Sequence, residues 1–232
     1  MAARDESKRL KIALLGAEST GKSQLATELA AQLCAQGIYA IAVSEYLREW
    51  CEREGRVPQQ PEQAHIAQTQ QTRIEAATAQ ASCVIADTTP LMTAVYSEFI
   101  FSDTHLHLDA LAYQKSFDLT LVTGLDMPWL ADGIQRDGAH VRPPVDALLR
   151  RLLHSASIPF EVIYGQGAER CARALQAVQR IQDTMNSIAP RAGYTPANTS
   201  NRLKNWQSTC EKCSDPDCEH RLFQDLKLDA KS

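Results

Sequence analysis

The chain has 232 residues, of which 44% are hydrophobic, and its 24 basic and 28 acidic side chains give a net charge of -4. This length and apolar content suit one α/β domain with a substantial core, plus a small appendage. The charge argues against broad attraction to nucleic acid or to an anionic membrane, and no segment is apolar for long enough to span a bilayer.

The N-terminal segment, residues 1–9, holds too many charged side chains for a signal peptide. The chain contains seven cysteines, an odd number. Cys34, Cys83 and Cys171 lie in apolar stretches of the sequence, where reduced cysteine behaves as a small hydrophobic residue. We therefore expect a cytoplasmic protein that is not held in a membrane.

A phosphate-binding pattern follows the first predicted strand, Lys11–Leu15. Residues 16–23 match G-x-x-x-x-G-K-S, in which the glycines let several backbone N–H groups point at one phosphate. The lysine reaches the β- and γ-phosphates, and the final hydroxyl is placed to bind Mg²⁺. The sequence therefore predicts an ATP and Mg²⁺ site, a Walker A loop, at Gly16, Ala17, Glu18, Ser19, Thr20, Gly21, Lys22 and Ser23.

A helix is expected directly after this loop, because the free N–H groups and the dipole of a helix N-terminus favour phosphate charge. Residues Gln24–Leu33 fit, since Leu25, Leu29 and Leu33 fall on one helical face. Further along, short apolar runs alternate with helical patterns. The runs are Tyr39–Val43, Cys83–Ala86, Leu119–Val122 and Phe160–Ile163, and the helical stretches are Pro61–Ala81, Leu91–Ile100, Pro144–Ala156 and Gly167–Ile181.

Continuous apolar runs are typical of strands that are buried on both faces of a parallel sheet. A βαβ series that opens with a phosphate loop therefore predicts an α/β, doubly wound, three-layer fold with a parallel five-stranded sheet. Ligands of such folds bind at the carboxyl ends of the strands, so we expect chemistry in the residues that follow each strand.

Two acidic residues follow predicted strands, and each has a second interpretation. Asp87, at the end of the third strand, is the candidate for the Mg²⁺ shell, or else an N-cap of the helix Leu91–Ile100. Glu45, after the second strand, is the candidate for binding or deprotonating an acceptor hydroxyl, or else an exposed loop acid.

Cations in the predicted loops could stabilise a transferring phosphate. Arg48, Arg136 and Arg142 are candidates, although loop arginines are usually solvated. Arg136 is preferred, because Gly133, Gly138 and a Pro-Pro pair bracket it in a lid-like segment. His105 and His107 lack a third metal ligand nearby, so surface or packing roles are expected for both.

The sequence lacks two features that are typical of nucleotide hydrolases, which argues against hydrolysis as the main activity. A motor-type ATPase would follow the strand-end Asp with a Glu that polarises water, but Thr88 takes that place. A GTPase would need Asp-x-x-Gly after the third strand, where the chain has Asp-Thr-Thr-Pro at 87–90. Transfer of a phosphate to a bound acceptor is therefore favoured over hydrolysis.

From Lys11 to about Ile181 the chain resembles the NadR-like P-loop kinases of the ribosylnicotinamide kinase type, which are grouped with AAA-like ATP-binding domains. The likeness lies in the phosphate loop, in Glu-Tyr-x-Arg-Glu at 45–49, in Asp-Thr at 87–88 and in Pro-Trp-x-x-Asp-Gly at 128–133. It implies a P-loop nucleoside-kinase-like fold and transfer of the ATP γ-phosphate to the 5′-hydroxyl of nicotinamide riboside, giving NMN. It also implies an acceptor site at Glu45, Tyr46, Arg48, Trp129 and Asp132.

Two positions depart from the family pattern. An aromatic residue usually precedes the Glu-Tyr pair and stacks on the nicotinamide, whereas this chain has Ser44. The family's Asp-Gly-hydrophobic-Arg reads Asp-Gly-Ile-Gln at 132–135, which moves the arginine on to Arg136. A different nucleoside, or another small hydroxylated acceptor, therefore remains open.

The globular pattern ends near residue 188, so we expect a kinase domain over residues 1–188, a linker over 189–205 and a cysteine-rich tail over 206–232. The tail contains Cys210, Cys213, Cys218 and His220, with the spacing of a small zinc knuckle. A tail this short could fold around a structural Zn²⁺ through these four ligands, and incidental cysteines in a flexible tail are the alternative.

Two functions from different classes follow. The first is an ATP-dependent kinase that acts on a small nucleoside-like molecule. The second is an ATP-binding switch or ATPase whose zinc tail contacts a protein or nucleic-acid partner that the sequence does not identify. Binding of nucleic acid is the less favoured of these, because acidic side chains are interleaved with the basic residues of the tail.

Overall fold

The computed structural model describes residues 9–130 and 138–188. Its five strands form one parallel sheet in the order β2-β3-β1-β4-β5. The strands are β1 (Leu10–Leu15), β2 (Ala40–Val43), β3 (Cys83–Asp87), β4 (Leu119–Thr123) and β5 (Glu161–Ile163). This arrangement confirms the predicted five-stranded parallel sheet.

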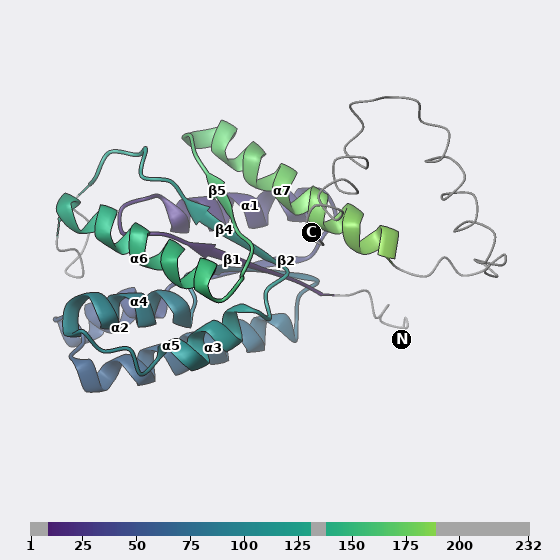
Figure 1. Cartoon of the computed structure of the whole chain (residues 1–232). Coiled ribbons are helices and arrows are strands. Elements are labelled where there is room, and N and C mark those ends of the chain that lie inside the picture. Colours follow the sequence, from purple (N-terminus) through teal and green to yellow (C-terminus); the bar gives the residue numbers. More distant parts are fainter. Residues whose placement is uncertain (1–8, 131–137, 189–232) are drawn as a thin grey trace, which may run out of the picture. The chain divides into compact units, whose positions relative to one another are not determined.

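Helices cover both faces of the sheet (Figure 1). The α-helices are α1 (Lys22–Ala35), α2 (Tyr46–Glu54), α3 (Gln63–Thr78), α4 (Pro90–Phe101), α5 (His107–Gln114), α6 (Arg142–Ser155) and α7 (Gly167–Ile188). Two 3-10 turns, η1 (Gln60–Glu62) and η2 (Ala139–Val141), precede α3 and α6. Among the residues described, no helix is long and apolar enough to cross a membrane.

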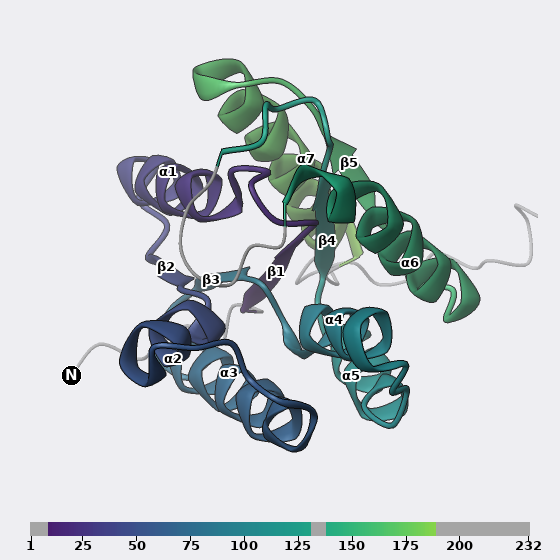
Figure 2. The same ribbon diagram turned by 90° about the vertical axis from the view of Figure 1, so that its left-hand side faces the viewer.

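Alternation along β1 divides the core between the two faces. Ile12 and Leu14 are fully buried and pack with apolar residues of α1 and α7 on one face. Ala13 and Leu15 pack with α4 and α6 on the other face, where residues of α3 form a neighbouring cluster against β2 and β3. Figure 2 shows the same division, with α1 and α7 on one side of the sheet and α3, α4 and α5 on the other. These are the three predicted layers.

Several element boundaries differ from the predicted ones for local reasons. Helix α1 begins at Lys22, two residues earlier than expected, because Gly21 has a left-handed conformation and serves as its N-cap. Helix α3 begins at Gln63, because Pro61 lies in the 3-10 turn η1 before it. Helices α2 and α5 were not predicted. The first has nine residues and the second has eight, which leaves little room for a helical repeat to show in the sequence.

Candidate functional site

The phosphate loop joins β1 to α1 and takes a backbone path that requires glycine. Gly16 has a φ of 143°, and a Cβ atom there would lie 2.1 Å from Oγ1 of Thr123. No side chain fits at that distance, so the loop passes directly against the end of β4. Lys22 Nζ donates a 2.8 Å hydrogen bond to the backbone oxygen of Ala17, and Ser23 lies in the first turn of α1. The side chain of Lys22 therefore folds back onto the backbone of its own loop.

Thr20 braces the loop from inside the protein. Its buried hydroxyl lies 2.7 Å from the backbone oxygen of Ala17 and 2.7 Å from Oγ1 of Thr123. Its backbone oxygen accepts a 2.6 Å hydrogen bond from Nη1 of Arg170, in the first turn of α7. Contacts from β4 and α7 thus fix the position of the phosphate loop.

Glu18 and Ser19 connect the loop to the segment that follows β4. Oε1 of Glu18 accepts hydrogen bonds from Nε1 of Trp129 (3.0 Å) and from the backbone nitrogen of Gly138 (3.2 Å). The hydroxyl of Ser19 accepts from the nitrogen of Leu130 at 2.7 Å and donates to its oxygen at 3.1 Å. Trp129 therefore contacts the phosphate loop. Asp132 and Arg136 lie outside the described residues.

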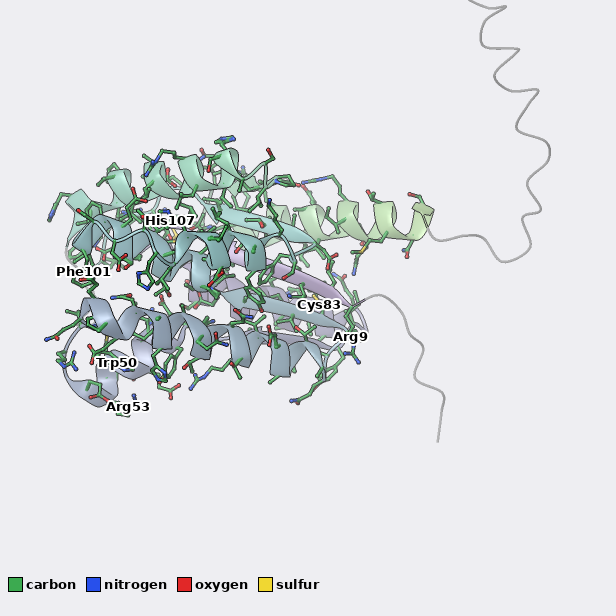
Figure 3. All side chains as sticks on the ribbon, turned by 60° about the horizontal axis from the view of Figure 1, so that its bottom comes forward. Arg9, Trp50, Arg53, Cys83, Phe101 and His107 are labelled. Atoms are coloured by element: carbon green, nitrogen blue, oxygen red, sulfur yellow. The ribbon has the colours of Figure 1, made fainter. Side chains whose placement is uncertain are left out.

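One cavity of about 830 Å³ extends from the phosphate loop toward α2, α3 and α4. It lies at the carboxyl ends of the strands. Figure 3 shows Phe101, which lines the cavity, at the opposite end of the molecule from Arg9 and Cys83, where β1 and β3 begin. The predicted site residues that line it are Gly16, Glu18, Ser19, Thr20, Gly21, Lys22, Ser23, Glu45 and Arg48.

Ala17 and Arg142 do not line this cavity, and three further predicted residues also lie outside its wall. Tyr46 is 4% exposed and packs in a small cluster with Trp50 and Ile66, and the guanidinium of Arg73 lies over its ring at 4.5 Å. Trp129 and Asp87 are also absent from the cavity wall. The sequence could not separate residues that face the cavity from those that support it.

Glu45 lies where the ends of β2 and β3 meet. It is the N-cap of α2, and the hydroxyl of Thr88 donates to Oε1 of Glu45 over 3.5 Å. Thr88 has a φ of 77°, which is uncommon for a threonine, and its backbone oxygen accepts a 3.1 Å hydrogen bond from Gln70. The oxygen of the same Gln70 amide accepts from the backbone nitrogen of Tyr46 at 2.8 Å. Gln70 thus joins the two strand ends.

Asp87 pairs in register with Leu14 at the end of β3, beside the start of the phosphate loop. Asp87 is not the N-cap of α4, which was its alternative role. Thr89 caps that helix, and its hydroxyl accepts a hydrogen bond from the backbone nitrogen of Leu91 at 3.3 Å. Asp87 is 2% exposed, and its Oδ1 has no hydrogen-bond partner among the described residues. A buried carboxylate oxygen without a partner suits a cation or the water shell of one.

Two buried arginines lie near Met127: Arg142, which the sequence offered as a candidate for contacting phosphate, and Arg170, which had no signal in the sequence. Arg142 is 6% exposed rather than solvated, and its Nη1 donates to the oxygen of Met127 at 2.9 Å. Arg170 is 3% exposed, burial lowers the pKa of its guanidinium, and its Nη1 also contacts the sulfur of Met127 at 2.7 Å. Each arginine keeps Nε and Nη2 atoms that are buried and have no partner among the described residues.

The histidines have the surface and packing roles expected for them. His105 is exposed and pairs with Asp103 at 2.7 Å, and His107 lies 3.1 Å from Glu98. The described part of the chain contains no group of three or more His, Cys, Asp or Glu residues that could hold a metal by themselves. The predicted zinc ligands Cys210, Cys213, Cys218 and His220 lie outside the described residues.

Comparisons with known proteins agree with this architecture. Residues 11–170 match a family model described as an AAA domain. No curated protein sequence matches the chain. Among solved structures, the NadR protein in complex with NR has a TM-score of 0.60 at 21% identity, covering 75% of this chain and 52% of that one. Thymidylate kinase from Ehrlichia chaffeensis has a TM-score of 0.54 at 14% identity, covering 75% of this chain and all of that one.

A second NadR structure, in complex with NAD and AMP-PNP, has a TM-score of 0.59 at 20% identity and covers 75% of this chain. The present chain spans about half the length of these NadR structures, which it covers to 52% and 49%. At these identities the likeness shows the fold: an α/β P-loop kinase fold of the NadR type. Since the family model covers well over half of its residues, the chain belongs to the AAA-domain family.

Proposed function

We propose that the protein is an ATP-dependent kinase that transfers the γ-phosphate to the hydroxyl of a small nucleoside-like acceptor. The observation that carries this proposal is that Lys22 of the phosphate loop and Glu45 of the β2 end line one and the same cavity. Phosphoryl transfer needs a phosphate cradle and a carboxylate that orients the attacking hydroxyl within one enclosed space. The NadR and thymidylate kinase structures that share the fold support this interpretation.

In this proposal the loop Gly16–Ser23 binds the phosphates of ATP through its backbone N–H groups, and Lys22 moves from the oxygen of Ala17 to the β- and γ-phosphates. Ser23 and the unpartnered Oδ1 of Asp87 would hold Mg²⁺ and its waters. Bound Mg²⁺ would neutralise charge on the phosphate oxygens. The buried guanidinium groups of Arg142 and Arg170 supply further positive charge near the loop.

The acceptor hydroxyl would meet Glu45, which takes its proton or holds it in line for attack. Arg48, in the first turn of α2, lies in the same wall and would contact the acceptor or the transferring phosphate. Arg136 as the transition-state cation and Asp132 as an acceptor ligand stay predictions of the sequence. Tyr46 and Trp129 support the site in this proposal, Tyr46 by packing and Trp129 through its hydrogen bond to Glu18.

Nicotinamide riboside is the best candidate acceptor, since the structures with the shared fold include NadR in complex with NR. Ser44, at the position where the family pattern has a stacking aromatic residue, is exposed, so a ring bound here must find its stacking surface elsewhere. Another nucleoside is therefore the alternative acceptor.

A thermal-shift screen identifies the acceptor directly. The protein is mixed with a non-hydrolysable ATP analogue and Mg²⁺, and nucleosides are added singly, with nicotinamide riboside in the panel. A ligand that binds only the folded state raises the melting temperature in proportion to the logarithm of its concentration over Kd. We expect one nucleoside to give a selective shift that depends on the ATP analogue. A uniform absence of shifts would contradict the proposal.

A regulatory switch or ATPase is the second candidate, and the motif Cys210, Cys213, Cys218 and His220 in the proposed tail 206–232 is what favours it. Four protein ligands would leave Zn²⁺ no open position for water, so the metal would be structural. Metal analysis of the full chain, purified without chelator, should find one zinc per chain, and Cys213→Ser should lose it without a change in ATP binding. A zinc content near zero, or a disulfide between Cys210 and Cys213, would remove the motif as an argument.

A further inference from the structure

Two helices turn one face each toward the part of the cavity that lies away from the phosphate loop. Helix α3 contributes Gln63, Ile66 and Gln70, which are spaced three and four residues apart. Helix α4 contributes Met92, Thr93, Tyr96, Ile100 and Phe101 to the same cavity. Most of these side chains are apolar, so the few polar atoms among them decide which ligand group can enter.

The side chain of Gln63 is mostly buried but lines the cavity, and its amide oxygen stays accessible from it. Its side chain is 4% exposed, and its one hydrogen bond among the described residues is a long 3.5 Å contact from Nε2 to the oxygen of Pro58. Its Oε1 atom has no partner in that part of the chain. Gln70 lies seven residues further along the same face of α3 and differs from Gln63, because both its amide oxygen and its amide nitrogen make hydrogen bonds with backbone groups. An amide oxygen that lines a cavity and has no protein partner can accept a hydrogen bond from a bound ligand.

Thr93 gives the matching observation on α4. It is 7% exposed, it lines the cavity, and its hydroxyl has no hydrogen bond among the described residues. A hydroxyl can both donate and accept, and the amide of Gln63 offers one donor group and one acceptor atom. The two helices therefore present complementary, unused polar atoms within an apolar wall.

Charge is confined to the other part of the cavity. Among the described residues that line it, the charged side chains are Glu18, Lys22, Glu45 and Arg48, which come from the phosphate loop and from the β2 end with the start of α2. Helices α3 and α4 contribute none. A phosphate or carboxylate of the ligand would be buried against this wall without a counter-charge, which is strongly unfavourable.

From these observations we infer that Gln63 and Thr93 determine acceptor specificity by hydrogen-bonding an uncharged amide-type edge, a C=O beside an N–H, on a planar ring. A carboxamide substituent and the edge of a nucleobase share this chemistry, and Met92 and Tyr96 supply apolar surface for the ring. The inference rests on the proposed kinase function and refines its substrate class. It also predicts that an acceptor carrying a carboxylate in place of the amide is rejected.

The test uses three probes: nicotinamide riboside, its carboxylate analogue nicotinic acid riboside, and uridine as a nucleobase probe. ATP-dependent phosphorylation of each is measured for the wild-type protein, Gln63→Leu, Gln63→Glu and Thr93→Val, and melting temperatures are recorded for all four. Gln68→Leu is the matched control, because Gln68 lies on the same helix and is exposed. A site built to bind a polar group discriminates strongly against an analogue that cannot replace it.

We expect the wild-type protein to prefer an amide-type probe over the carboxylate by more than about a hundredfold in kcat/KM. Gln63→Leu should lower kcat/KM for that probe by about 10- to 100-fold with the KM for ATP unchanged, and Gln68→Leu should change neither. If transfer proceeds and Gln63→Leu, Gln63→Glu and Thr93→Val all keep wild-type selectivity while folded, the inference is wrong and the kinase proposal stands. If the wild-type protein phosphorylates no nucleoside, both are wrong.

Discussion

The indole nitrogen of Trp129 lies 3.0 Å from Oε1 of Glu18, so a side chain that follows β4 is anchored on the phosphate loop. The backbone nitrogen of Gly138 reaches the same oxygen at 3.2 Å. One carboxylate of the loop therefore bonds a residue on each side of the segment 131–137.

Trp129→Phe should destabilise the fold, because it removes a hydrogen bond to a charged group while it keeps most of the apolar volume. We expect the free energy of unfolding to fall by about 1.5 kcal/mol, measured by urea denaturation. Tyr39→Phe serves as the control, since Tyr39 is 57% exposed, and it should change the stability little. Equal stability of Trp129→Phe and the control would show that the Glu18 contact contributes nothing.

Gly16→Ala should disrupt the phosphate loop. Its Cβ atom would lie 2.1 Å from Oγ1 of Thr123, whereas a Cβ at Gly37, which also has a positive φ of 84°, would meet nothing within 4 Å. Gly37→Ala should therefore cost only the conformational strain of about 1 kcal/mol. Gly16→Ala should cost more and should also weaken binding of an ATP analogue, measured by calorimetry. Similar effects of the two substitutions would contradict the close approach of the loop to β4.

The sequence predicted the parts of the site that depend on local pattern. The phosphate loop, its flanking strand and helix, and the positions of Glu45 and Asp87 at strand ends all follow from residue spacing, and the structure has them at the carboxyl edge of one sheet. The sequence could not show which helix faces line the cavity. The sequence therefore did not identify Gln63 and Thr93, which matter only because α3 and α4 turn them toward the same cavity.

Long-range contacts were also invisible to the sequence. Arg170 lies 150 residues from Thr20 along the chain. Arg142 was a candidate for contacting phosphate, but the sequence did not indicate that it is buried beside Met127. The hydrogen bond from the indole nitrogen of Trp129 to Glu18 is another contact that the sequence did not indicate. A sequence motif can identify candidate site residues. The buried groups that orient them are brought together only by tertiary packing, so the sequence does not reveal them.

Arg170→Met should weaken nucleotide binding although Arg170 is remote in sequence. The substitution leaves the backbone oxygen of Thr20 without its 2.6 Å donor and removes a positive charge near the phosphate loop. We expect about tenfold weaker binding of an ATP analogue, equivalent to about 1.4 kcal/mol, by calorimetry. Arg173→Met is the control, since Arg173 is exposed and pairs with Glu169 in its own helix. Unchanged affinity in Arg170→Met would contradict the bracing role of α7.

Cys51 should resist alkylation. Burial raises the pKa of its thiol to about 11 from an ordinary value of 9.0, so at pH 8 its thiolate fraction is about a hundredfold smaller than that of an ordinary cysteine. Cys34 is exposed and should be labelled first by iodoacetamide, as measured by peptide mass spectrometry at pH 8. In urea both should react alike. Rapid labelling of Cys51 in the folded protein would contradict its burial.

The raised pKa of Cys51 also fixes the direction of its pH effect on stability. The folded state favours the neutral thiol, so the contribution is fully present below the ordinary pKa of 9.0 and is lost as the pH rises through about 11. Cys51→Ser, whose hydroxyl does not ionise in this range, should lose less stability than the wild-type protein between these two pH values. A parallel loss in both proteins would assign the alkaline effect to other groups.

Release of ADP from ATP and Mg²⁺, measured with and without each nucleoside of the panel, tests the central claim most directly. We expect slow release without an acceptor, because Thr88 takes the place of a water-polarising glutamate, and a strong rise with one nucleoside, whose phosphorylated product is identified by mass spectrometry. Lys22→Ala should abolish the rise, and Lys115→Ala, which removes an exposed lysine, should leave it intact. Vigorous ADP release that no nucleoside increases, or acceptor-dependent turnover that survives Lys22→Ala, would contradict the account.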